Sequence, residues 1–177
     1  MKSSFVSEIL KPFLVLVIIC LAASLLLGAT NALTADVIAA NEAAAMEATR
    51  RSVLPGAGSF TELEADPALG VDSIFKEDSG LGYVITASYK GYGGYVTVTV
   101  GFDAEGAVVG ISADVSSETQ GVGTKAGAAQ HLSQYMGVDV DFNGVDLITS
   151  ATYSSTAVHE SVKAATAAYQ AISGEAK

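Results

Sequence analysis

A run of small and hydroxyl-bearing residues between positions 146 and 155 is the part of this sequence best suited to chemistry. Thr152 offers a hydroxyl that can be esterified, and its small neighbours leave room for a bulky group. The hydroxyls of residues 154–156 are suited to cap a helix that we expect to begin near Ala157. The free N–H groups at such a helix end favour an anionic phosphate. The alternative is a Ser/Thr-rich loop that only caps the helix.

A second segment, residues 118–125, reads Glu-Thr-Gln-Gly-Val-Gly-Thr-Lys. A Gly-x-Gly pattern before a predicted helix is a weak signal by itself, because the same pattern marks a flexible turn. Its backbone N–H groups could nevertheless hold a phosphate or an electron-rich ring. Tyr92 and Tyr95 could stack on such a ring, although aromatic residues on strands more often serve ordinary packing.

Together these segments resemble the FMN-binding domain family found in the G subunit of Rnf complexes and in the C subunit of sodium-pumping NADH:quinone oxidoreductases. In that family a flavin transferase attaches FMN through its phosphate to the last Thr of an Asp-x-x-Ser/Thr-Gly-Ala-Thr motif. Asp146, Thr149, Ala151 and Thr152 fit this motif, and Ser150 replaces the usual Gly with another small residue. The resemblance therefore implies a covalent FMN phosphoester on Thr152.

The segment at 118–125 is similar to the family's Glu-Thr-Pro-Gly-Leu-Gly stretch, which helps to enclose the flavin. Gln120 replaces the Pro, Val122 replaces the Leu, and Ser116 stands where the family often has His. The likeness continues in consistent order over nearly the whole chain, and the short length favours the Rnf type. The cofactor-binding residues that the resemblance implies are Glu118, Thr119, Gly121, Gly123, Thr149, Ser150, Ala151, Thr152, Tyr153 and Ser154.

The resemblance implies an electron-transfer subunit of a membrane translocase that couples electron flow between ferredoxin and NAD to Na⁺ or H⁺ transport, and that is not catalytic alone. The implied partners are other membrane subunits of the complex and a flavin transferase. Two alternatives stay open: a flavin subunit of a quinone-reducing or extracellular electron-transfer system, and a non-redox anchored binding domain. No catalytic Ser/His/Asp or Cys/His arrangement stands out, and His131 and His159 lack further ligands at metal spacing.

An uncharged stretch from Pro12 to Ala35 is long enough to cross the ~30 Å hydrocarbon layer of a membrane. We therefore expect a transmembrane helix at 12–34 in a cell membrane. Lys2 and Lys11 precede it, so residues 1–11 are predicted to be a cytoplasmic tail and the main domain to be extracytoplasmic. A cleaved signal peptide and a lipid anchor on Cys20 are the less favoured alternatives.

The remaining sequence predicts one α+β domain, an antiparallel sheet flanked by helices that forms the FMN-binding part at 59–177, after a stalk at 35–58. Alternation of apolar and polar residues indicates strands, and apolar residues repeating about every 3.6 positions indicate helices. The net charge of −10 excludes a nucleic-acid partner, and one cysteine excludes a disulfide framework. The expected strands are 71–75, 82–89, 95–100, 107–113 and 145–149, and the expected helices are 125–135 and 157–172.

Overall fold

The protein is seen in a computed structural model that describes residues 2–65, 69–137, 142 and 144–175. The chain forms two compact units, residues 1–45 and residues 46–177. The first helix, α1 (Lys2–Val53), makes up the first unit and continues into the second, where its last turns belong to the domain.

Helix α1 exposes large apolar side chains on all its sides between Phe13 and Leu27. By length and composition it is suited to span a membrane, and it is the single such helix in the described part of the chain. A helix that is apolar all round requires apolar surroundings, and about 20 residues at ~1.5 Å each match the hydrocarbon layer. These properties suggest that the helix anchors the chain in a membrane.

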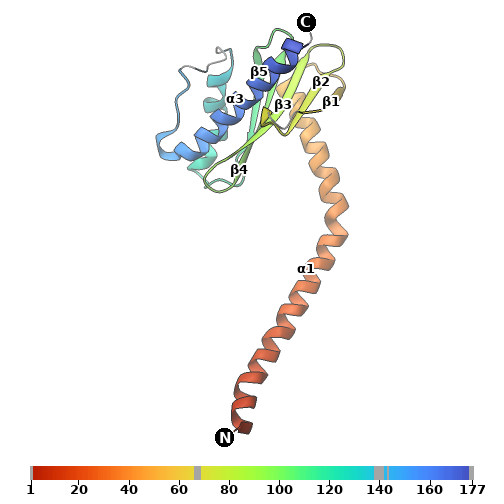
Figure 1. Ribbon diagram of the computed structural model, residues 1–177, viewed down its shortest axis with the longest axis vertical. Helices are drawn as coiled ribbons and strands as arrows, with labels where there is room; N and C mark the ends of the chain where they lie inside the picture. Colours follow the sequence, from red (N-terminus) through yellow and green to blue (C-terminus); the bar gives the residue numbers. More distant parts are fainter. Residues whose placement is uncertain (1, 66–68, 138–141, 143, 176–177) are drawn as a thin grey trace. The chain divides into compact units, whose positions relative to one another are not determined.

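The domain is built on a five-stranded antiparallel sheet in which every strand pairs with its sequence neighbour. Helix α3 (Thr152–Glu175) lies along one face of this sheet (Figure 1). The α+β class predicted from the sequence is therefore confirmed. The strands are β1 (Phe60–Leu63), β2 (Ser73–Glu77), β3 (Gly82–Lys90), β4 (Tyr95–Asp103) and β5 (Val108–Asp114).

The main core lies between the sheet and α3. Strand β4 alternates as expected, with valines at 96, 98 and 100 fully buried and threonines at 97 and 99 half-buried. Helix α3 meets this face with Val158, Val162, Ala165 and Tyr169, spaced as one stripe of a helix. This packing fixes where α3 begins relative to the strands.

On the opposite face, the end of α1 rests on a pair of glycines. Gly101 of β4 and Gly110 of β5 are direct cross-strand partners beside a β-bulge. A Cβ built on either glycine would lie 2.2 Å from the carbonyl oxygen of Val53. Only glycine allows this approach, which lets Val53 and Leu54 pack with Phe75 in a second, smaller core.

Among the described residues, two of the predicted elements do not have the form that the sequence predicts. The predicted helix at 125–135 is broken into η2 (Gly123–Gly127), α2 (Ala129–Leu132) and η3 (Ser133–Tyr135), because Ala128 is extended. The predicted strand at 145–149 is irregular up to η4 (Thr149–Ala151). Two of its backbone N–H groups donate to side chains instead of to a neighbouring strand: that of Asp146 to Gln134 and that of Ile148 to Ser155. The Val145 N–H donates to the Phe142 carbonyl.

The last helix begins at Thr152, five residues before the predicted start at Ala157. The prediction of N-caps at 154–156 is therefore wrong, since these residues lie inside the first turns. The start moves because η4 leads directly into α3, and the Ser155 hydroxyl bonds back to the Ala151 carbonyl. Strand β1 was not predicted, and the short strand expected at 71–75 is β2 at Ser73–Glu77.

The glycine pair gives a test of the second core. Gly110→Ala should lower the free energy of unfolding of the domain by roughly 1–3 kcal/mol, because the new methyl group overlaps the Val53 carbonyl. Thermal unfolding of the detergent-solubilised chain measures the change. Gly174→Ala is the control: its Cβ meets no described atom within 4 Å, so stability should be unchanged or slightly higher. Equal stability of Gly110→Ala and wild type would contradict the close contact.

Candidate functional site

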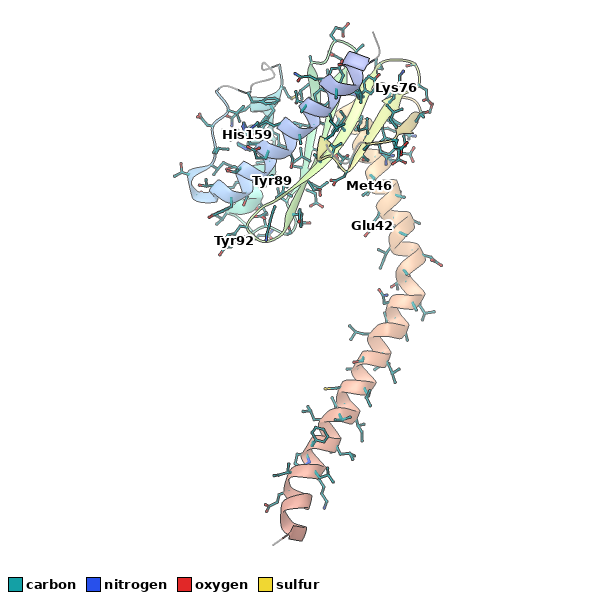
Figure 2. All side chains as sticks on the ribbon, viewed as in Figure 1. Glu42, Met46, Lys76, Tyr89, Tyr92 and His159 are labelled. Carbon is teal, nitrogen blue, oxygen red and sulfur yellow. The ribbon has the colours of Figure 1, made fainter. Side chains whose placement is uncertain are left out.

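A pocket of about 310 Å³ opens where three separate segments meet. One is the turn between β3 and β4, where Figure 2 shows Tyr92 at the tip of the hairpin. The second is the loop after β5, and the third is η4 with the first turn of α3. The lining residues are Tyr92, Glu118, Thr119, Val122, Gly123, Thr149, Ser150, Ala151, Thr152, Tyr153 and Ser154. Nine of the ten residues predicted from the sequence are thus brought together.

Thr152 is the first residue of α3, and its side chain is exposed at the pocket. Its hydroxyl donates to the Thr149 carbonyl at 3.3 Å, a long bond that holds the oxygen near the loop. Backbone N–H groups in the first turn of a helix point outward and carry partial positive charge. The hydroxyl of Thr152 therefore lies where a linked phosphate would be stabilised.

Neighbouring hydroxyls are placed differently. Ser155 is fully buried, donates to the Ala151 carbonyl and accepts the Ile148 N–H. Ser154 is 2% exposed and donates to the Glu118 carboxylate. Both hydroxyls are engaged inside the domain, whereas that of Thr152 is accessible.

Glu118 joins the three segments of the pocket. Its two carboxylate oxygens accept the Gly93 N–H at 3.0 Å and the Ser154 hydroxyl at 2.5 Å. A Cβ on Gly91 would lie 2.4 Å from one of these oxygens, and a Cβ on Gly123 would lie 2.8 Å from the other. The two glycines therefore leave the space that the buried carboxylate occupies.

The environment of Glu118 favours its ionised form. Burial by itself raises the pKa of a carboxyl group, and it is the largest single influence here. Hydrogen bonds from Ser154 and from the backbone of residues 92–94 together outweigh it, so the pKa of Glu118 lies below the ordinary 4.5. Glu118 is consequently an anion at neutral pH.

Two exposed tyrosines flank the pocket, Tyr92 at 74% and Tyr153 at 71% exposure. Their ring centroids are 6.4 Å apart and their planes are tilted by 48°. Of the two tyrosines that the sequence suggests could stack on a ring, Tyr92 lines the pocket and Tyr95 does not. Val122 also lines the pocket and is not among the predicted binding residues. Gly121 lies outside the lining, has a positive φ of 74° and donates its N–H to Thr124.

The two histidines lie away from the pocket, around the buried Tyr135. His131 is 5% exposed, and the ring centroids of His131 and His159 lie 5.9 and 6.0 Å from that of Tyr135. Burial lowers the pKa of both histidines and raises that of Tyr135 to about 12. Within the described ranges, no group of three His, Cys, Asp or Glu residues is placed to hold a metal ion.

The lowered pKa of Glu118 predicts a contribution to acid sensitivity. The pKa of Glu118 is lower in the folded protein than in the unfolded chain, so the ionised carboxylate stabilises the fold. This stabilisation is complete above the unfolded pKa and is lost as the pH falls through the folded pKa. Glu118→Gln should therefore show a smaller loss of stability than wild type between about pH 5 and pH 3. Urea unfolding at a series of pH values measures this.

The Glu118→Gln variant should still lose some stability at acid pH, since Glu77 and Asp78 also have lowered pKa values. Glu62→Gln, on the exposed side of β1, is the control and should follow the wild-type curve. If Glu118→Gln has the same acid slope as wild type, the carboxylate is not held ionised by the fold.

The pocket-bearing part of the chain, residues 91–167, matches the family described as FMN-binding domain, and residues 1–53 match the RnfG N-terminal region. The second match ends at the last residue of α1. The G subunit of the Na⁺-translocating ferredoxin:NAD⁺ oxidoreductase complex of Acetobacterium woodii is 30% identical over 196 aligned residues, covering 93% of each chain. The proton-translocating counterpart of Clostridium ljungdahlii is 25% identical over 163 residues, covering 85% of each. The chain belongs to the family of Rnf complex G subunits, with an FMN-binding domain.

Proposed function

We propose that this chain is the flavin-carrying electron-transfer subunit of an ion-translocating ferredoxin:NAD⁺ oxidoreductase, with FMN joined through its phosphate to Thr152. The observation that carries the proposal is the convergence of the two sequence segments on one pocket with the exposed Thr152 hydroxyl at its edge. The names of the two relatives supply the reaction of the complex.

The pocket suits the cofactor in size and chemistry. Its volume of about 310 Å³ lies at the lower end for small-molecule sites, and its open side accommodates the rest of a large ligand. The tyrosines at its rim offer flat faces for the isoalloxazine ring, and Val122 adds an apolar contact. Small residues at 150 and 151 let the phosphate approach the backbone.

The residues divide the work of holding the cofactor. Thr152 would be the tether: its Oγ1 would replace one oxygen substituent on the FMN phosphorus, and that substituent would leave with the proton of the hydroxyl, as water when free FMN is the donor. The resulting phosphodiester would keep one anionic oxygen. The N-terminus of α3 stabilises that charge. Glu118 accepts hydrogen bonds from both Gly93 and Ser154, which holds the three segments around the pocket in fixed positions.

When bound, the FMN would supply the redox chemistry, since a flavin accepts and releases electrons reversibly. The protein fixes its position and its exposure to partners. The subunit is therefore a relay within the complex and is not catalytic alone. Its partners are the other membrane subunits, and a flavin transferase is needed for maturation.

Two other functions make different predictions. A flavin subunit of a quinone-reducing or extracellular electron-transfer system would carry the same tether but co-purify with different subunits. A non-redox anchored binding domain would be colourless. The match to G subunits along nearly the entire chain favours the first proposal over both.

Intact mass tests the tether. Wild type co-expressed with a flavin transferase should gain the mass of FMN less one water, and Thr152→Ala should not. Thr156→Ala is the matched control because it removes a hydroxyl one turn along α3 that does not line the pocket; it should be modified fully. An unmodified, colourless wild type despite an active transferase rules out the flavin proposal, whereas modification of Thr152→Ala rules out only the assigned residue.

Orientation is tested with cysteine labelling. Lys2 and Lys11 before the apolar span support an orientation with the N-terminus in the cytoplasm and the FMN-binding domain outside. Cys20, the only native cysteine, lies within the predicted span, so it gives a low background for maleimide reagents. A membrane-impermeant maleimide applied to intact cells should label Glu62→Cys but should label Ser4→Cys only after permeabilisation. The reverse pattern would show the opposite topology.

A further inference from the structure

The domain buries two carboxylates, Glu77 and Glu118, which are 2% and 6% exposed. Each accepts hydrogen bonds from a serine hydroxyl and from backbone N–H groups. Neither takes part in the two ion pairs found among the residues that the structure describes. Of the two, Glu118 lines the pocket and Glu77 does not.

Hydrogen bonding alone does not require a charge at position 118. A glutamine there could accept the Gly93 N–H with its oxygen and donate its amide to the Ser154 oxygen, since a hydroxyl can also accept. Burial of a carboxylate without an ion-pair partner costs free energy, and here the hydrogen bonds to Glu118 outweigh that cost, so the side chain stays charged. Because a neutral residue could make the same link, the charge itself is free to act on a group bound in the pocket.

We propose that the negative charge of Glu118, fixed in the wall of the pocket by Gly93 and Ser154, lowers the reduction potential of the bound FMN. This inference rests on the proposed function. An FMN that takes up two electrons and one proton carries one more negative charge than the oxidised form. A nearby anion repels that added charge and so favours the oxidised flavin.

The geometry supports an effect that salt screens weakly. The carboxylate is buried between Gly91 and Gly123, and both oxygens are held by hydrogen bonds, so it cannot swing out into water. Charges in such partly dry surroundings act more strongly than exposed ones. Glu118 thus tunes the cofactor through its field, without contact with the reacting atoms being required.

The test is a spectroelectrochemical titration of the full-length, flavinylated protein in detergent, with electrons supplied by the electrode. Glu118→Gln should raise the midpoint potential by at least about 30 mV, which is a tenfold change in the equilibrium constant of a two-electron couple. Glu118→Asp keeps the charge and should stay closer to wild type than Glu118→Gln. Glu77→Gln, a buried carboxylate outside the pocket, should leave the potential unchanged.

A fully flavinylated Glu118→Gln protein with the wild-type potential overturns the inference. So does an equal shift in Glu77→Gln. If Glu118→Gln does not fold, Thr119→Lys replaces it, because it adds a positive charge at an exposed position of the pocket lining. This variant is measured at low ionic strength, where an exposed charge is screened least, and an unchanged potential under that condition also overturns the inference. Failure of the proposed function is distinct, since it appears as a wild-type protein without the FMN mass.

Discussion

The hydrogen bonds of one buried carboxylate hold the site together. Glu118 lies in a loop, and through Gly93 and Ser154 it reaches a strand turn and the first turn of a helix. These segments are far apart in the chain, and the strand pairing that the structure describes ends before it reaches them, at Lys90–Tyr95 and at Thr97–Asp114. The loop can keep its position because its anchor is buried and satisfied at both oxygens, a strongly directional arrangement. The shape of the pocket follows from this anchor.

The two faces of the sheet have different roles: one packs against α3 beside the pocket, and the other packs against the end of α1. On one face the valines of β4 and the stripe of α3 make the larger core, which positions the start of the helix beside the loop. On the other face Gly101 and Gly110 admit the end of α1 directly onto the backbone. The same central strands therefore support the pocket on one face and contact the end of α1 on the other.

Sequence reasoning predicted the elements whose pattern is local. The strong alternation of β4 and the uninterrupted apolar run of α1 each point to one structure. The prediction failed where tertiary contacts decide the structure. Residues 145–149 look like a strand, but two of their N–H groups donate to the side chains of Gln134 and Ser155. The early start of α3 is likewise set by η4. The pocket segments were predictable by resemblance, and the sequence offered Tyr92 and Tyr95 alike as stacking residues. Which of the two lies at the pocket depends on where the hairpin turn meets α3.

The exposure of Thr152 has a consequence for the order of assembly. On the proposed assignment, a maturation enzyme needs no unfolding of the domain to reach its target, since the hydroxyl already protrudes at the end of a finished helix. Ser154 and Ser155, two and three residues away, are sealed inside the same fold. Folding before modification would therefore remove two hydroxyls of the α3 start from the possible acceptors, whereas Thr149 and Ser150 stay exposed beside Thr152. An incompletely folded chain would lose that part of the selectivity.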